Sequence, residues 1–319
     1  MKRLICFFPL FLLLSACVIV VDGPCAGLKE KRFNIEEESK FLVKKPLTLR
    51  INTKGFIDTV VVSPSKDKTL LIKTEVKATV STNIDDVRVK VEEKNGTIYV
   101  RTVLKPENRG VSICNLKGVS RIMVFVPDNV KHIVFNTSST DFKCSGVKID
   151  LMNINTSSGD VAVANSKFSE MEIDTSSGDI SLKNVKVSDF RIDSSSGDLA
   201  VSDCTFENFH GNFSSGDITG GFPVSIGKGK VSTSSGDVVL KLKKFRKLRI
   251  NTSSGDVKLV LIHPEKIYLY AETNSGDFNI RIPLPDGVKV KNNVLEFGES
   301  GMPELNISTS SGDISLSNM

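Results

Sequence analysis

The tripeptide Ser-Gly-Asp recurs through the second half of this 319-residue chain at a nearly constant spacing. Successive glycines are 19, 19, 19, 20, 19, 21 and 36 residues apart, and the last interval is close to two periods. A degenerate copy, Thr137-Ser138-Ser139-Thr140-Asp141, lies 19 residues before the first one. The repeat therefore runs from about His132 to residue 319, with a disguised copy expected at 288–298. The repeated pairs are Gly159 and Asp160, Gly178 and Asp179, Gly197 and Asp198, Gly216 and Asp217, Gly236 and Asp237, Gly255 and Asp256, Gly276 and Asp277, and Gly312 and Asp313.

Apolar residues occupy fixed positions around each glycine. In the repeat of Gly178 they are Ile180 and Leu182 after the glycine, and Met171 and Ile173 before it. A polar residue separates the members of each pair, which is the period-two pattern of a strand with one buried face. Each repeat thus predicts two strands joined by a sharp Thr-Ser-Ser-Gly-Asp turn.

A unit of this size cannot bury its apolar side chains without a neighbour above and below it, so equal units must stack. The predicted fold class is all-β: a β-solenoid of about 19-residue coils. About ten coils at a strand spacing of about 4.8 Å give a rod on the order of 50 Å long. The absence of Trp and the presence of only three Tyr agree with a narrow core filled by aliphatic residues. The repeat is too long for the nonapeptide calcium-binding β-roll and lacks its glycine pattern, which excludes that family.

The turn residues have a predicted structural role. Glycine supplies a backbone with φ > 0 at little steric cost, and Ser and Asp side chains bond to backbone amides that a bend leaves unpaired. Stacked carboxylates about 5 Å apart repel by about 1 kcal/mol per neighbour in water, so amide donors, lysines or bound cations must offset the repulsion. The alternatives for this aspartate column are a calcium ladder, or the carboxylates of a polysaccharide-active β-helix enzyme.

An active site needs a unique cluster of different groups, whereas this column repeats one residue on every coil. The turn serines have no recurring histidine beside them to act as a base. His132, His210 and His263 are far apart in the sequence, and none has a Cys or His neighbour at metal-ligand spacing. We therefore predict no enzyme, no catalytic residue, no metal site and no cofactor. Glycines that replace apolar residues near His210 predict a locally irregular coil there.

The first residues form an export signal. Lys2 and Arg3 precede an apolar run, and small residues follow it up to Cys17. The sequence Leu14-Ser15-Ala16-Cys17 resembles the lipobox of bacterial lipoproteins, which implies cleavage after residue 16 and lipid on Cys17. Several acyl chains on one residue would hold the protein at a membrane. The alternative is an uncleaved anchor over residues 4–21, which is barely long enough to span a bilayer.

Four cysteines remain in an exported chain whose signal is removed and whose Cys17 is lipidated. Cys144 and Cys204 lie about three coils apart, roughly 14 Å, and Cα atoms more than about 7 Å apart cannot be bridged without backbone movement. Cys25 with Cys114 is the one disulfide that we consider.

Charge gives little indication of a partner. The formal charge is +5, and removal of Lys2 and Arg3 lowers it to +3. We interpret the charges as interspersed, with no block of five basic residues, and predict no nucleic-acid partner.

The chain divides into four regions by pattern. Residues 1–16 are the predicted signal peptide, residues 17–45 the lipidated cysteine and a tether, and residues 132–319 the solenoid. Residues 46–131 are predicted to be a β-rich cap, because short alternating runs occur there and Asn95-Gly96 predicts a hairpin turn.

The repeated Thr-Ser-Ser-Gly-Asp motif resembles a bacterial β-strand-repeat family of putative adhesins. The resemblance covers roughly Leu47 to the end, and residues 49–55 are similar to a weak first copy. It implies a β-solenoid and supplies no catalytic residue. We therefore expect a lipid-anchored protein of the bacterial cell envelope whose repeat binds proteins, glycans or cell-wall polymer. The alternatives are a structural or assembly element of the envelope and, after that, a polysaccharide-active enzyme.

Overall fold

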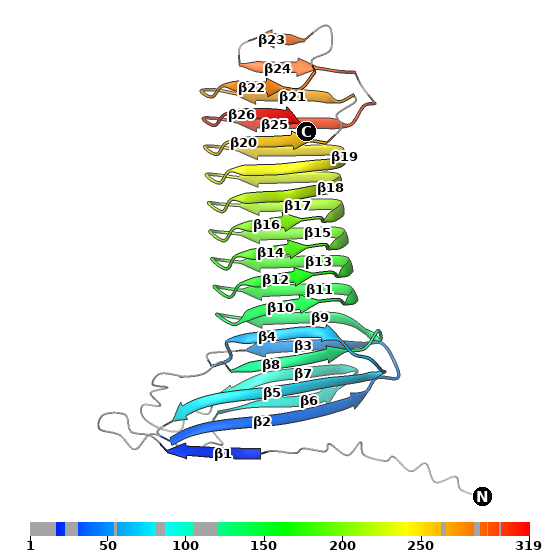
Figure 1. Cartoon of the computed structure of the whole chain (residues 1–319), viewed down its shortest axis with the longest axis vertical. Helices are drawn as coiled ribbons and strands as arrows, with labels where there is room; N and C mark the ends of the chain where they lie inside the picture. Colours follow the sequence, from blue (N-terminus) through cyan, green and yellow to red (C-terminus); the bar gives the residue numbers. More distant parts are fainter. Residues whose placement is uncertain are drawn as a thin grey trace, which may run out of the picture.

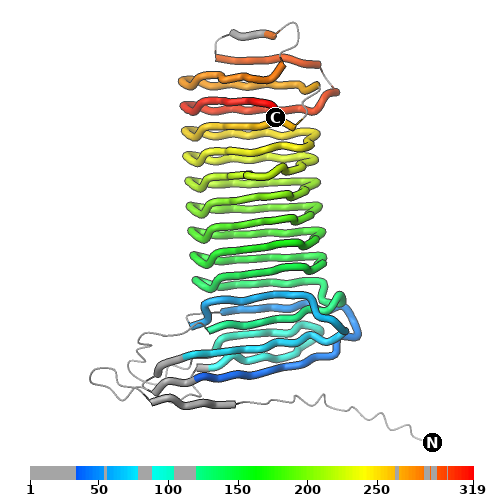
Figure 2. Tube along the Cα trace, viewed as in Figure 1, coloured from blue at the N-terminus to red at the C-terminus, as the bar shows by residue number. Residues whose placement is uncertain are grey.

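The computed structural model describes residues 17–22, 31–53, 56–80, 87–104, 120–262, 266–283, 288–291, 293–299 and 301–319. Within these ranges the chain forms 26 strands and no helix. Most strands run parallel in a regular stack of coils, with antiparallel strands at both ends (Figure 1). The tube in Figure 2 shows the chain winding through this stack from one end toward the other. The predicted all-β solenoid is confirmed.

Each regular coil contains a long strand, the Ser-Gly-Asp turn, a short strand and a second corner. Long strands stack on one side and short strands on the other, for example β11 on β9 and β12 on β10. The strands of these coils are β9 (Val130–Thr137), β10 (Asp141–Ser145), β11 (Lys148–Thr156), β12 (Val161–Ala164), β13 (Lys167–Thr175), β14 (Ile180–Lys183), β15 (Lys186–Ser194), β16 (Leu199–Ser202), β17 (Thr205–Phe213), β18 (Ile218–Thr233), β19 (Val238–Thr252) and β20 (Val257–Leu261). β18 and β19 are long because each continues around the second corner into the next coil.

The core lies between the two sides of the stack. Neighbouring coils pair in register, so Ile173 stands beside the equivalent isoleucines of the coils above and below it. Met171, Ile173, Ile180 and Leu182 are at most 1% exposed, as the alternation predicts. Burying a side chain of this size contributes about 1.5–3 kcal/mol. Each column is therefore a continuous source of stability along the rod.

The coil near His210 is irregular, as its glycines predict, but the irregularity lies at its second corner and not in β17. Gly211 replaces an apolar side chain, and the rings of Phe209 and Phe213 fill the vacated space at 3.1–3.4 Å from where its Cβ would be. The register shift occurs in the following corner, between Gly220 and Ser225. Compensating volume in neighbouring residues thus preserves the pairing of β17.

The N-terminal part of the chain begins with a coil of the same stack. β3 (Leu47–Thr53) pairs in parallel with β9, and β4 (Thr59–Pro64) pairs in parallel with β10. This agrees with the weak first copy at residues 49–55. On their other edges β3 and β4 pair with β7 (Thr97–Leu104) and β8 (Arg121–Val126).

Antiparallel strands cover the first coils. β6 (Val87–Lys94) forms a hairpin with β7, and Asn95 and Gly96 have the positive φ values, 51° and 72°, expected of its turn. β5 (Thr69–Val80) pairs with β8, and β2 (Lys31–Leu42) pairs with β5. β1 (Cys17–Asp22) pairs with β2. These strands extend the stack at its lower end in Figure 1.

The tether predicted for residues 17–45 is therefore wrong for β2. Residues 31–42 pair along their whole length with β5. Ile35, Ser39 and Phe41 are buried and alternate with more exposed residues. A strand rich in charge still forms here because every second residue faces the interior.

The last coil in the sequence is not the last coil in the stack. β25 (Glu304–Thr309) pairs in parallel with β19 on one edge and with β21 (Tyr268–Thr273) on the other. β26 (Ile314–Asn318) lies in the same way between β20 and β22 (Phe278–Arg281). The chain thus passes over one coil position after β20 and later returns to fill it, so the red strands lie below the orange ones in Figure 1.

The disguised copy expected at 288–298 is an antiparallel addition. β24 (Val294–Phe297) runs antiparallel to β21, and β23 (Lys289–Lys291) runs antiparallel to β24. Gly298 has a φ of +94°, which favours glycine, where the chain turns away from β24. This segment covers the exposed edge of the last coil. Among the described residues no helix is long and apolar enough to cross a membrane.

Candidate functional site

The eight predicted Asp residues form one ladder on the turn side of the rod. The carboxylate Oδ1 of every Asp except Asp277, the last of the ladder, accepts a hydrogen bond from the backbone N–H of the Asp in the next coil, at 2.8–3.0 Å. Asp141 of the degenerate copy begins the ladder by accepting from Asp160. A hydrogen bond to a charged group is worth about 1.5–3 kcal/mol, which exceeds the repulsion of about 1 kcal/mol between neighbouring carboxylates. Amide donors are therefore what offsets the stacked charge.

The glycines of the turn have a different role from the one that we predicted. In the described part of the chain the positive φ values fall on other residues, so φ > 0 is not the reason for glycine here. A Cβ on Gly178 would lie 2.1 Å from the carbonyl oxygen of Gly159 in the preceding coil. The other seven repeat glycines have the same conflict at 2.0–2.1 Å. Glycine is required because two turns approach each other more closely than any side chain allows.

A threonine three residues before the glycine completes the turn. Thr175 is buried, and its Oγ1 accepts the backbone N–H of Gly178 at 3.0 Å. Five other coils repeat this bond at 2.9–3.0 Å. The serines between them are exposed, and their backbone N–H groups bond to the preceding coil. The polar groups of the turn are thus largely used to hold one coil to the next.

The structure brings no mixed cluster of reactive groups to this ladder. His132 lies on β9 and has Thr48 within 3.5 Å, while His210 lies on β17 beside Asn212. His263 is outside the described residues. Over the described ranges, no three His, Cys, Asp or Glu residues are close enough together to hold a metal ion. The geometry of the column is that of a structural turn.

The cysteines fall into two groups. Cys17 is the first residue of β1, whereas residues 1–16, Cys25 and Cys114 lie outside the described residues, so the signal, the lipid and the disulfide stay predictions. Cys144 and Cys204 are buried free thiols, as their separation predicts. Burial raises the pKa of Cys144 to about 12 and also raises the pKa of Cys204. Neither thiol has the exposed, ionised character of a nucleophile.

The second corner has its own repeat, which the sequence analysis missed. Gly146, Asn165, Asn184 and Asp203 follow one another at 19-residue spacing and have φ values of 51–75°. Asn and Asp tolerate this left-handed conformation better than other side chains. Their periodic placement was the signal that could have located the corner. From β18 onward the corner loses these residues, and the chain takes a different path.

Charge separates along the rod instead of being interspersed as we had interpreted it. Residues 141–217 contain six Lys or Arg against thirteen Asp or Glu, a formal charge of −7. Residues 218–270 contain ten against three, a formal charge of +7. Most of the basic residues belong to 241–249, whose sequence is Lys-Leu-Lys-Lys-Phe-Arg-Lys-Leu-Arg. The small net charge therefore conceals an acidic half and a basic half.

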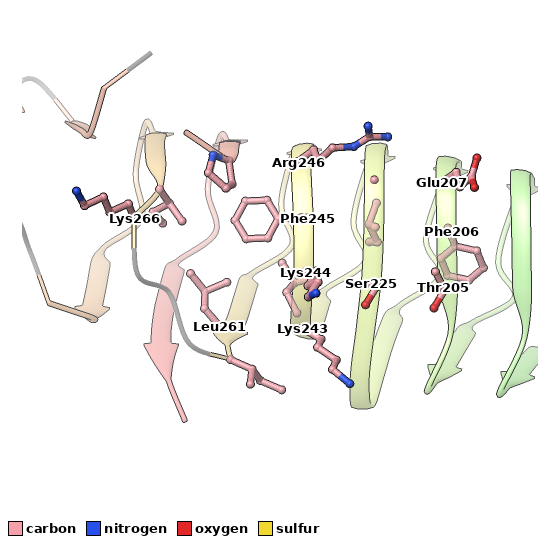
Figure 3. Close-up of a pocket in the computed structure, with 16 residues that line it drawn as sticks. Thr205, Phe206, Glu207, Ser225, Lys243, Lys244, Phe245, Arg246, Leu261 and Lys266 are labelled. Atoms are coloured by element: carbon pink, nitrogen blue, oxygen red, sulfur yellow. The ribbon is translucent and has the colours of Figure 1, made fainter. Parts of the chain in front are cut away.

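A cavity of about 620 Å³ lies at the altered second corner of the basic half. It extends from β17 across β18 and β19 to Leu261, Ile262, Lys266, Ile267 and Pro303 (Figure 3). At this level of the rod, β20 is followed in the sequence by β21, which lies two coil positions further along the stack. The coil of β25 and β26 occupies the position in between. At this corner Phe245 is only partly buried. The out-of-order coil thus accompanies an open site, which we name the β19 cavity.

A family model described as Toastrack DUF4097 matches residues 48–317, which is well over half of the chain. Several solved structures are similar at low sequence identity. A putative lipid binding protein from Parabacteroides distasonis is 17% identical, with a TM-score of 0.50 over 88% of this chain and 96% of that chain. A putative adhesin from Bacteroides fragilis is 13% identical, with a TM-score of 0.39 over 89% of this chain and 97% of that chain. These similarities concern the fold alone, and no curated protein matches the chain.

Proposed function

The chain belongs to the Toastrack DUF4097 family, and from this membership and the geometry of its turns we propose that it is a non-catalytic binding scaffold of the bacterial cell envelope. The proposal rests on the hydrogen bonds that the repeated polar groups of the turns form. The Asp carboxylates and Thr hydroxyls of the turns bond between or within coils, which is a structural use. Binding therefore falls to the outer faces of the rod, where the repeat is interrupted.

Two further points support a scaffold that holds a ligand without converting it. The chain resembles a family of putative adhesins, and the similar structure from Parabacteroides distasonis is described as a putative lipid binding protein. Both descriptions name binding as the activity. The ligands that we propose for the outer faces are proteins, glycans or cell-wall polymer.

The proposed attachment is lipid on Cys17 after removal of residues 1–16. Cys17 begins β1, and β1 pairs with β2 at the N-terminal end of the rod. Lipid at this residue would hold that end at the membrane and direct the stack of coils away from it. Such a geometry suits a protein that presents its faces to partners at a distance from the bilayer.

Labelling of intact cells with a membrane-impermeant amine reagent tests the proposal, combined with a glycan and cell-wall-polymer binding screen of the purified full chain. We expect surface labelling, binding of at least one polymer, and loss of membrane attachment in a Cys17→Ser variant. A Cys17→Ser chain that stays lipidated contradicts the anchor. A labelled chain that binds no polymer or envelope protein favours a structural element, and depolymerisation of a bound glycan favours an enzyme.

A further inference from the structure

The β19 cavity combines an apolar floor with a basic rim. Phe206, Ile226, Leu242 and Leu261 contribute the floor and are 1–2% exposed. Phe245 adds a partly buried ring above them. A volume of about 620 Å³ falls within the range of about 300–1,000 Å³ that is typical of small-molecule sites. The floor residues are themselves almost fully buried, so the apolar contact open to a ligand that enters from the surface is mainly the partly buried ring of Phe245.

The rim carries an excess of positive charge. Lys243, Lys244, Arg246 and Lys266 line the cavity and are exposed, whereas Glu207 is the one carboxylate among the described lining residues. Within the described ranges none of these four cations has an ion pair with a carboxylate. Their charge is thus available to an anion.

Figure 3 shows the side chains of Lys244, Phe245 and Arg246 leaving β19 in different directions, with the Phe245 ring on one side of the strand and the Arg246 guanidinium reaching over the neighbouring strand. The guanidinium of Arg246 lies over Gly227 of the neighbouring strand β18. A Cβ on Gly227 would lie 3.0 Å from Nη2 of Arg246 and 2.5 Å from the carbonyl oxygen of Glu207. Glycine at this position lets the guanidinium lie against the backbone of β18. A guanidinium in that setting is suited to bidentate contact with a phosphate or carboxylate.

From this arrangement we propose that the β19 cavity binds a single anionic amphiphile, with its acyl chain against Phe245 and the floor and its phosphate or carboxylate headgroup at Lys244 and Arg246. Charge complementarity selects the headgroup, because the described residues of the rim present four cations against one carboxylate. The concave apolar floor favours a ligand with an acyl chain, which leaves water when it binds. A free inorganic anion and a nucleic-acid backbone have no such apolar part. The source is a lipid monomer and not the surface of a bilayer, since the apolar residues lie inside a hollow. The inference goes beyond the proposed scaffold function, which does not require a lipid ligand.

Calorimetry with dodecyl phosphate below its micellar concentration tests this inference. The protein is the chain from residue 17 onward with Cys17→Ser, which keeps every described residue except Cys17. We expect saturable binding of one dodecyl phosphate per chain. The double variant Lys244→Gln, Arg246→Gln should weaken this binding at least about tenfold, because hydrogen bonds to a charged group contribute about 1.5–3 kcal/mol and each 1.4 kcal/mol is a factor of ten. Phe245→Gln should weaken it as well, while inorganic phosphate and dodecyl maltoside should bind at least about tenfold more weakly.

Lys258→Gln is the matched control, because Lys258 is exposed on β20 outside the lining of the cavity. It should leave binding unchanged, and circular dichroism should show that all variants keep the β-structure of the parent chain. The proposal is overturned if dodecyl maltoside or inorganic phosphate binds as tightly as dodecyl phosphate. It is also overturned if the rim variants bind like the parent, or if the chain binds phosphatidylglycerol vesicles but no monomer. A negative result in the polymer screen would not change the expected binding of dodecyl phosphate. The scaffold proposal and the amphiphile proposal can therefore be rejected independently of each other.

Discussion

At each turn, glycine and aspartate make the contacts that hold one coil to the next. Gly178 leaves room for the carbonyl oxygen of Gly159, and Asp179 accepts the backbone N–H of Asp198. The two contacts depend on each other, because the carboxylate reaches the next amide only if the turns are close. The identity of both residues is therefore set by the distance between coils and needs no functional explanation.

Replacement of Gly178 by Ala should destabilise the chain by about 3 kcal/mol, the upper end of the cost of overpacking, because the added Cβ meets backbone atoms that cannot move aside. Gly221→Ala is the matched control, since its Cβ would have no atom within 4 Å, and its effect should stay within about 0.5 kcal/mol. Asp179→Asn keeps an acceptor oxygen and should cost less than Gly178→Ala. Denaturant unfolding of the three variants measures the ranking, and equal effects at Gly178 and Gly221 would show that the turns can separate at little cost.

The same residues show how far a sequence predicts a site. The 19-residue period predicted that Gly178 and Asp179 lie at a turn, and the apolar alternation predicted that Ile173 and Ile180 lie in the core. Both predictions need only the sequence pattern of one coil and the stacking of equal coils. The reason for glycine did not follow, since a positive φ and a close approach both require the absence of Cβ. Only the distance to the preceding coil separates the two reasons, and that distance is a property of the stack.

At the scale of elements, strands were easier to predict than their order. Every coil has the same Gly-Asp turn, so β22 and β26 could each form the same backbone and turn hydrogen bonds with the edge of β20. The spatial order β20, β26, β22 depends on how the linking segments return, and these carry no repeat. Likewise Glu36, Glu37 and Glu38 favoured a tether in the sequence, while the buried alternation of Ile35, Ser39 and Phe41 decided for a strand.

The inserted coil should control the stability of the strands beyond it. Leu316 on β26 is fully buried, so Leu316→Asp places an unpaired charge in the core and should expel β25 and β26 from the stack. Because β21 and β22 reach the rest of the rod through this coil, their backbone amides should then exchange hydrogen faster, while those of β11 to β16 stay protected. Hydrogen exchange read by mass spectrometry provides the measurement.

Met319→Asp is the control, because Met319 is 74% exposed and follows β26. It should leave the exchange of β21 and β22 unchanged. Protection of residues 268–281 that survives Leu316→Asp would mean that β21 and β22 dock directly on β19 and β20. The coils would then have a second stable arrangement, in which β21 and β22 follow β19 and β20 in the stack as they do in the sequence.

At the scale of the whole molecule, the rod separates its charge along its length. Residues 141–217 carry a formal −7 and residues 218–270 a formal +7, and the regular stack places them in successive coils. Four coils at about 4.8 Å span roughly 20 Å, which is longer than the Debye length of about 10 Å at 0.1 M salt. A partner near one half is therefore screened from the other, and the basic half that contains the β19 cavity acts as an independent patch.

The chain from residue 17 onward should consequently bind both anion- and cation-exchange resins at pH 7 and low salt, although its net charge is small. Lys243→Gln with Lys244→Gln removes two charges from the basic half, so elution from the cation exchanger should move to lower salt. Elution from the anion exchanger should stay nearly constant, because elution takes place at about 0.1 M salt or more, where the Debye length of about 10 Å is shorter than most of the distance to the acidic half. Asp179→Asn with Asp198→Asn, in the acidic half, should produce the opposite pair of results. A uniform surface would instead shift elution from both resins together for either variant, since only net charge would then decide retention.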